Sequence, residues 1–236
     1  MARLARVLWP ETPYHVTQRG NARRCVFESD NDRLVYLDLL QTHSRLQELS
    51  IAGYCLMSNH VHLIAIPRGA ESLPLALKHA HGRYAAYFNA RHASSGHVWQ
   101  GRYYSCPLDE AHFWAALRYT ELNPVRAGMV ERAAGYRWSS AAAHCGLDAP
   151  AAWLEMAPFV GAWTTAAWRE YLAQAGAAVE AEAIRKSTHT GRPLGTPEFV
   201  ERLEKALGRR LAPQKGGRPA EQFRDQRQGL LTFGAE

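Results

Sequence analysis

The sequence predicts an α+β protein with a ferredoxin-like antiparallel sheet, helices packed on one face, and a C-terminal helical and basic extension. Short segments with an apolar period of two alternate with longer segments of helical periodicity. Up to Pro124 they follow the order strand, helix, strand, strand, helix, strand, helix. That order pairs the central strands antiparallel and uses two helices as crossovers. A chain of 236 residues, 47% of them hydrophobic, can bury the core that this fold needs.

Each element carries a start or stop signal. Ser58-Asn59 joins the two central strands and is a tight hairpin signal. Asp30 and Asp109 are good N-cap residues, and Pro124 ends the third helix because the residue before a proline disfavours helical dihedral angles. The predicted strands cover residues 14–19, 51–57, 60–66 and 98–108, and the predicted helices cover residues 30–49, 72–92 and 110–123.

After Gly128 the pattern changes to helical stretches, mainly 158–176 and 198–207. We therefore expect three parts: a first domain over 1–145, a helical extension over 146–184, and a C-terminal tail over 185–236. Eleven basic and five acidic residues lie between Arg185 and Gln228, and their difference equals the +6 net charge of the whole chain. A basic tail on a nearly neutral body indicates a nucleic-acid partner. The alternative is a charged tail that is merely solvated.

Neither the cysteines nor the apolar runs point to export or to a membrane. The four cysteines are far apart and form no Cys-x-x-Cys pair, and the apolar runs are too short to cross a bilayer. The N-terminus lacks the apolar stretch of a secretory signal. We expect reduced thiols, no membrane association, and a cytoplasmic, nucleoid-associated protein.

The candidate chemistry starts from two histidines on one strand. His60 and His62 are separated by one apolar residue, so both side chains point to the same face and can converge on one metal ion. Tyr119 and Asn123 are four apart and share a helix face, offering a phenolic nucleophile and an amide oxygen. Two imidazoles and an amide oxygen suit Mg²⁺ or Mn²⁺. From pattern alone the histidine pair could instead be structural, although the lack of evident carboxylate partners favours metal binding, and Tyr119 could equally belong to the core.

These residues lie in motifs that together resemble a known family. The sequence is similar to the HUH single-tyrosine transposases, in which a hydrophobic residue separates two histidines, and most of all to the REP-associated tyrosine transposases. The matching stretches are Tyr14 to Asn21, Met57 to His62, Trp99 to Tyr103, Tyr119 to Val130, Trp138 to Ser140, and the Gly-Arg-Pro-Leu-Gly of the tail.

The resemblance implies that residues 1–145 form an HUH tyrosine transposase catalytic domain and that the basic tail over 185–236 binds DNA. It also implies a role for each site residue. His60, His62 and Asn123 would bind the divalent cation, Mg²⁺ or Mn²⁺. Tyr119 would attack a phosphodiester of single-stranded DNA beside a palindromic hairpin, forming a 5′-phosphotyrosine link and releasing a 3′-hydroxyl. Attack by another 3′-hydroxyl would rejoin strands, and the protein would act as a monomer or a homodimer.

DNA contacts are expected outside the catalytic residues. Arginines beside the first strand and on the second helix could follow phosphates, and Trp99 could stack on unpaired bases. The two Gly-Arg-Pro sites resemble hooks for a narrow minor groove. The expected DNA-binding residues are Arg19, Arg23, Arg24, Arg83, Trp99, Arg102, Arg192 and Arg218.

Other residues and other functions stay open. We expect His15 to line the site from the first strand, Glu121 to occupy an exposed helix position, and His79 and His81 to face solvent or DNA. One rival function is a domesticated DNA-hairpin-binding protein that does not cleave. Another is a metal-dependent hydrolase that uses activated water without a covalent intermediate.

Overall fold

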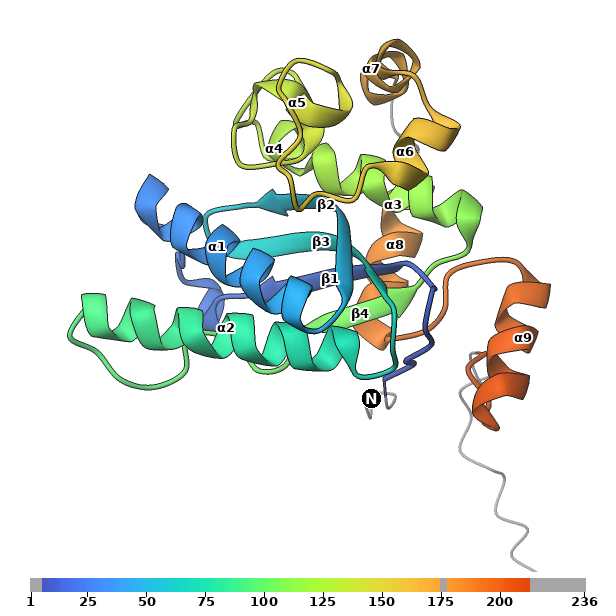
Figure 1. The fold of residues 1–236 in the computed structure, drawn as a ribbon, viewed down its shortest axis with the longest axis horizontal. Coiled ribbons are helices and arrows are strands. Elements are labelled where there is room, and N and C mark those ends of the chain that lie inside the picture. Colours follow the sequence, from blue (N-terminus) through green and yellow to red (C-terminus); the bar gives the residue numbers. More distant parts are fainter. Residues whose placement is uncertain (1–5, 175–177, 213–236) are drawn as a thin grey trace, which may run out of the picture.

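The computed structural model describes residues 6–174 and 178–212, and its centre is a four-stranded antiparallel sheet (Figure 1). The strand order is β2-β3-β1-β4, the order of a ferredoxin-like sheet. The strands are β1 (Tyr14–Arg19), β2 (Leu49–Leu56), β3 (His60–Pro67) and β4 (Tyr104–Pro107). The predicted α+β class and the hairpin at Ser58-Asn59 are confirmed.

Helices surround this sheet in the order that the sequence predicts as far as Pro124. The helices of the domain are α1 (Asp30–Leu46), α2 (Ser72–Arg91), α3 (Glu110–Glu121), α4 (Asn123–Arg126) and α5 (Ala141–His144), with 3-10 turns η1 (Asn21–Arg23) and η2 (Ala133–Gly135). The later helices are α6 (Ala157–Ala162), α7 (Thr165–Ala173), α8 (Ala178–Thr190) and α9 (Pro197–Leu207).

Two predicted elements differ from the structure. The fourth strand covers four residues instead of 98–108, because Gly101 turns the chain with a positive φ of 112°. The stretch 158–176 is not one helix. It breaks at Trp163, whose backbone is extended, and Thr164 then caps α7 by accepting a hydrogen bond from the Ala167 amide.

Helices cover both faces of the sheet. One core, under α1 and α2, contains Val16, Val61 and Leu63 of the central strands. The opposite core, under α3, contains Ile64 of β3 together with Leu117. Figure 1 shows α1 and α2 on the near side of the sheet and α3 and α8 behind it. The expectation of helices on one face therefore holds for the two crossover helices, and α3 occupies the other face.

A glycine lets α3 approach the sheet closely. Gly53 lies at a register shift between β2 and β3, and a Cβ built there would lie 2.2 Å from Cδ1 of Leu117. A larger residue fits only if the Leu117 side chain or the helix that carries it shifts. This contact sets the height of α3, and thus of Tyr119, above the strands.

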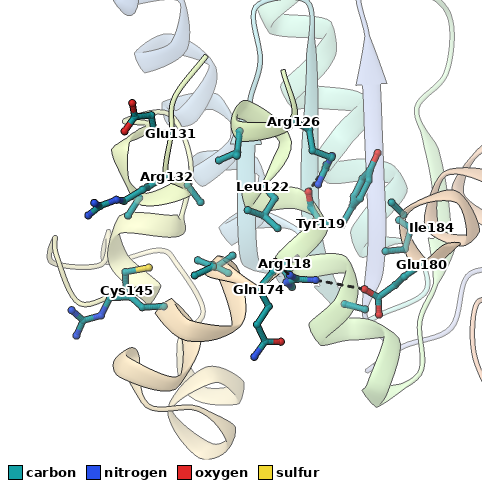
Figure 2. A pocket seen from close by; sticks show the side chains of 18 of the residues that line it. Arg118, Tyr119, Leu122, Arg126, Glu131, Arg132, Cys145, Gln174, Glu180 and Ile184 are labelled. Carbon is teal, nitrogen blue, oxygen red and sulfur yellow. Dashed lines mark hydrogen bonds and ion pairs between the residues drawn. The ribbon is translucent and has the colours of Figure 1, made fainter. Parts of the chain in front are cut away.

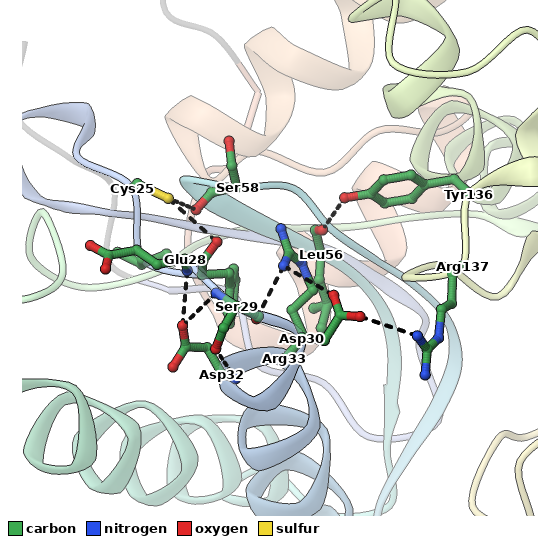
Figure 3. A network of polar contacts seen from close by, with 12 residues as sticks. Cys25, Glu28, Ser29, Asp30, Asp32, Arg33, Leu56, Ser58, Tyr136 and Arg137 are labelled. Carbon is green, nitrogen blue, oxygen red and sulfur yellow. Dashed lines mark hydrogen bonds and ion pairs between the residues drawn. The ribbon is translucent and has the colours of Figure 1, made fainter. Parts of the chain in front are cut away.

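A polar network fixes the hairpin turn that leads into β3 (Figure 3). Ser29 caps α1 in a reciprocal capping box with Asp32. The Cys25 thiol donates to the Ser58 carbonyl at 3.3 Å, and the Tyr136 hydroxyl donates to the Leu56 carbonyl at 2.7 Å. Segments on both sides of the turn are therefore tied to the start of α1 and to the chain near residue 136.

The beginning of the basic tail folds back onto the domain. Helix α8 packs against β4 and β1, and the expected boundary between residues 184 and 185 lies inside it. Helix α9 buries Phe199 and Leu203 against Val7. Arg218 lies outside the described residues. Among the helices that the structure describes, none is both long and apolar enough to span a membrane.

Candidate active site

Three histidines lie together on the sheet face beneath α3. His60 and His62 of β3 point to the same side, with ring centroids 5.0 Å apart, and His15 of β1 stacks on His62 at 5.1 Å. In the β1–β3 register Arg19 pairs with His60 and Thr17 pairs with His62. Strand alternation brings these side chains to one face, as the spacing predicts.

Hydrogen bonds define which nitrogen of His62 carries its proton. The Thr188 hydroxyl donates to the Ile184 carbonyl at 2.7 Å, so its oxygen accepts from Nδ1 of His15 at 2.6 Å. Nε2 of His15 then accepts from Nδ1 of His62 at 2.9 Å. This chain of hydrogen bonds leaves a lone pair on Nε2 of His62.

The same logic applies to His60. The Asn59 amide nitrogen donates to the Arg23 carbonyl at 3.0 Å, which orients its oxygen towards Nδ1 of His60 at 2.6 Å. His60 therefore donates from Nδ1 and also keeps a lone pair on Nε2. Such hydrogen bonds on one ring nitrogen are the usual support for a metal ligand at the other.

Burial keeps the three imidazoles neutral. Desolvation lowers the pKa of His15 to about 3 and that of His60 to about 4, and it holds the pKa of His62 well below 6.5. Nearby arginines and histidines lower these pKa values further. At neutral pH His60 and His62 can therefore each donate an electron pair from Nε2 to a cation.

Tyr119 lies over the histidines. Its ring meets His62 and His15 edge-on, with centroid distances of 5.7 and 5.6 Å, and its side chain is only 8% exposed. Nε of Arg185, from α8, donates to the Tyr119 hydroxyl at 3.3 Å. The Arg126 guanidinium stacks 4.0 Å from the ring centre and donates to the Tyr119 carbonyl at 2.7 Å (Figure 2). Two cations therefore flank the phenol.

Asn123 lies one turn beyond Tyr119, at the start of α4. Its amide nitrogen donates to the carbonyls of Tyr119 and Thr120 at 3.3 and 3.2 Å. Among the described residues no hydrogen bond uses its oxygen, and none joins it to His60 or His62. Two imidazole nitrogens and this oxygen are a donor set that fits Mg²⁺ or Mn²⁺. The described part of the chain contains no group of three His, Cys, Asp or Glu side chains suited to a metal.

Comparison with known proteins identifies the domain that holds this site. Residues 10–123 match the family model of IS200-like transposases. These residues belong to the IS200-like transposase family. The resemblance seen in the sequence motifs is confirmed at that level, and the match supports a role in DNA transposition for these residues. Among curated proteins, none matches the chain.

Solved structures support the fold. The transposase domain is similar to the structure of a REP-associated tyrosine transposase bound to a REP hairpin, with a TM-score of 0.51 and 16% identity, over 59% of this chain and 82% of that one. A candidate transposase from Deinococcus radiodurans R1 gives 17% identity over 54% of this chain and 92% of that one, but its TM-score of 0.36 is too low to support an argument.

The residues expected to contact DNA differ in how far they reach the surface. Trp99 is 8% exposed, donates to the His81 carbonyl at 2.9 Å, and packs in the core under α2, so its ring has little surface for stacking on a base. Arg19 lies beside His60, Arg24 stacks on Phe88, and Arg192 donates to the Leu211 carbonyl. Among the expected DNA-binding arginines that the structure describes, Arg23, Arg83 and Arg102 are exposed.

Two other expectations for the transposase domain are wrong. Glu121 is fully buried. Its carboxylate accepts hydrogen bonds from Ser140 and Trp168 at 2.6 and 2.9 Å and lies 2.5 Å from Nδ1 of His144, so these partners take the place of water. His81 is buried as well, bonded to the Tyr36 hydroxyl at 3.0 Å, whereas His79 is exposed as expected.

Proposed function

We propose that the chain is a divalent-metal-dependent transesterase of single-stranded DNA, in which Tyr119 is the nucleophile. The supporting observation is the contact of the Tyr119 ring with His62 and His15 on the sheet face that also carries His60. A phenol in contact with the neutral His62 imidazole, whose Nε2 lone pair is free like that of His60 on the same sheet face, is the arrangement that such a reaction needs.

The residues would divide the work as follows. The Tyr119 oxygen forms a bond to phosphorus, the bond from phosphorus to the 3′ oxygen breaks, and that oxygen leaves as a 3′-hydroxyl. Arg126 and Arg185 offer positive charge beside the tyrosine as negative charge develops on the phosphate. Mg²⁺ or Mn²⁺, held by Nε2 of His60 and His62 with the Asn123 oxygen, would supply Lewis-acid polarisation of a phosphate oxygen.

Hairpin DNA beside a single strand is the proposed substrate, and the nucleoid is the proposed place of action. The similar REP-associated tyrosine transposase was seen bound to a REP hairpin. Arg19 beside His60 and the exposed Arg23 near the hairpin turn place positive charge at one end of the site. Because Arg185 and Thr188 come from the same chain, we propose a site completed within one protomer.

Covalent capture tests the proposal. The protein is incubated with Mn²⁺ or Mg²⁺ and 3′-labelled hairpin oligonucleotides that carry random single-stranded flanks, and labelled protein is sought on a denaturing gel. We expect an adduct with the wild type and with Tyr171→Phe, a matched variant that loses a hydroxyl on α7. Tyr119→Phe should form none.

Each alternative result has a distinct meaning. An adduct in Tyr119→Phe would exclude Tyr119 as the nucleophile. Metal-dependent cleavage without an adduct would favour activated water. Tight binding without any cleavage would favour a domesticated hairpin-binding protein.

A further inference from the structure

A cavity of about 940 Å³ lies beside Tyr119, on the side of α3 away from the sheet. Its lining comes from α3, α4, α7 and α8, and Figure 2 shows Arg132 and Cys145 on one side of the labelled α3 residues, with Tyr119, Glu180 and Ile184 on the other. Its volume is at the upper end of the range for small-ligand pockets. None of the roles given above to the histidines or to Tyr119 uses this space.

The floor of the cavity is apolar. Leu122 and Val125 line it from the end of α3 and from α4, and Leu172 and Ile184 line it from α7 and α8. Apolar side chains around a concave space favour the flat, weakly hydrated face of an aromatic ring.

The mouth of the cavity is positively charged. Five arginines and two glutamates belong to its lining. Arg118 is 5% exposed and structural, since it donates to the Tyr171 carbonyl at 2.8 Å and lies 4.0 Å from Glu180. The remaining four arginines are exposed: Arg126, Arg132, Arg169 and Arg185. An apolar floor under a cationic mouth complements a ligand with an aromatic base and a phosphate.

We propose that this cavity takes an unstacked base of the DNA strand that Tyr119 attacks, one or two nucleotides from the cleaved phosphate. The inference rests on the proposed function, because the Tyr119 ring is a wall shared by the cavity and the histidine site. A strand passing the tyrosine must pass the mouth of the cavity. The base enters the apolar floor while its phosphates stay against the arginines, and the protein selects the base at that nucleotide by shape.

The test begins by locating the cleaved phosphate. Adducts are captured from the random-flank hairpin oligonucleotides with Mn²⁺, and the attached strands are sequenced. The best substrate is then made again with an abasic nucleotide at each position near the cleaved phosphate, and adduct formation is measured for three proteins. They are the wild type, Ala181→Trp, which fills the cavity from α8, and Ala183→Trp, the same change on the same helix outside the cavity lining.

We expect one abasic position next to the cleaved phosphate to slow adduct formation by the wild type about tenfold, the scale of losing one stacked base. Ala183→Trp should behave as the wild type. Ala181→Trp should be about tenfold slower on the intact strand and should lose its sensitivity to that abasic position.

The outcomes separate this inference from the proposed function. If the wild type forms no adduct with any oligonucleotide, the proposed function fails and the inference fails with it. If adducts form but Ala181→Trp matches Ala183→Trp, or no abasic position matters, the tyrosine chemistry stands and the base pocket is refuted.

Discussion

Glu121 is the strongest structural prediction, because one buried carboxylate joins three separate parts of the chain. It lies on α3 two residues after Tyr119 and accepts hydrogen bonds from Ser140 and from Trp168 of α7. It also lies 2.5 Å from Nδ1 of His144. None of its surface reaches solvent. Replacing it should loosen the helix that carries the nucleophile.

The size of the effect follows from the partners left behind. Glu121→Ala leaves the buried N–H groups of Trp168 and His144 without an acceptor, each costing about 1–3 kcal/mol, and leaves the Ser140 hydroxyl only its longer contact with the Tyr54 carbonyl at 3.4 Å. Partial relaxation and water entry reduce the sum, so we expect a loss of roughly 3–5 kcal/mol in the free energy of unfolding. Glu121→Gln keeps the volume but turns an NH₂ donor towards one of the donors, so it should fall between Ala and the wild type.

Urea unfolding followed by far-ultraviolet circular dichroism measures this loss. Glu170→Ala, at an exposed position of α7, is the control and should stay within about 0.5 kcal/mol of the wild type. A loss below about 1 kcal/mol in Glu121→Ala would refute the reasoning, because it would mean that the three partners find other acceptors without cost.

Three further predictions follow from other contacts. Without metal, the free energy of unfolding should fall as pH drops from about 6.5 to 4, because His15 and His60 have folded pKa values of about 3 and 4 and protonate more readily when unfolded. Each of these buried histidines should contribute up to ~1.4 kcal/mol per pH unit. Urea titrations that give equal stability at pH 7 and pH 5 would contradict this. Gly53→Ala should cost about 1–3 kcal/mol in the same assay, because its Cβ would overlap the Leu117 side chain on α3. An unchanged midpoint would show that Leu117 or α3 shifts without cost. Thr188→Val should raise the Mn²⁺ concentration needed for adduct formation about tenfold or more, because the hydrogen-bonded His15 and His62 rings could then adopt the other tautomer. Thr188→Ser keeps the hydroxyl and should need the same Mn²⁺ concentration as the wild type. Equal Mn²⁺ dependence in both variants would show that the hydrogen bonds from Thr188 to His62 do not support the metal site.

Local periodicity was enough to predict the sheet and the faces of its main residues. The two-residue spacing of His60 and His62 places both on one face, and the β1–β3 register adds Arg19 and His15 beside them. The crossover order predicts the strand order without further information. These features depend on neighbours in sequence or on a simple topology.

What the sequence could not predict depends on distant pairings. Arg185 and Thr188 reach Tyr119 and His15 from a helix far along the chain, and no spacing pattern signals that α8 packs on β4. Glu121 has the composition of an exposed helix position, and its burial depends on partners that arrive later in the chain. The sequence around Trp99 is typical of a strand, but Trp99 precedes the turn at Gly101 and its side chain packs in the core.

Mass spectrometry of the covalent adduct tests the central claim most directly. After incubation with hairpin DNA and Mn²⁺, the protein is digested with trypsin and nuclease, which releases residues 119–126 as one peptide whose only tyrosine is Tyr119. The account predicts that this peptide carries the mass of a nucleotide phosphate on its tyrosine. A nucleotide on any other peptide, or cleaved DNA with no modified peptide, would contradict it.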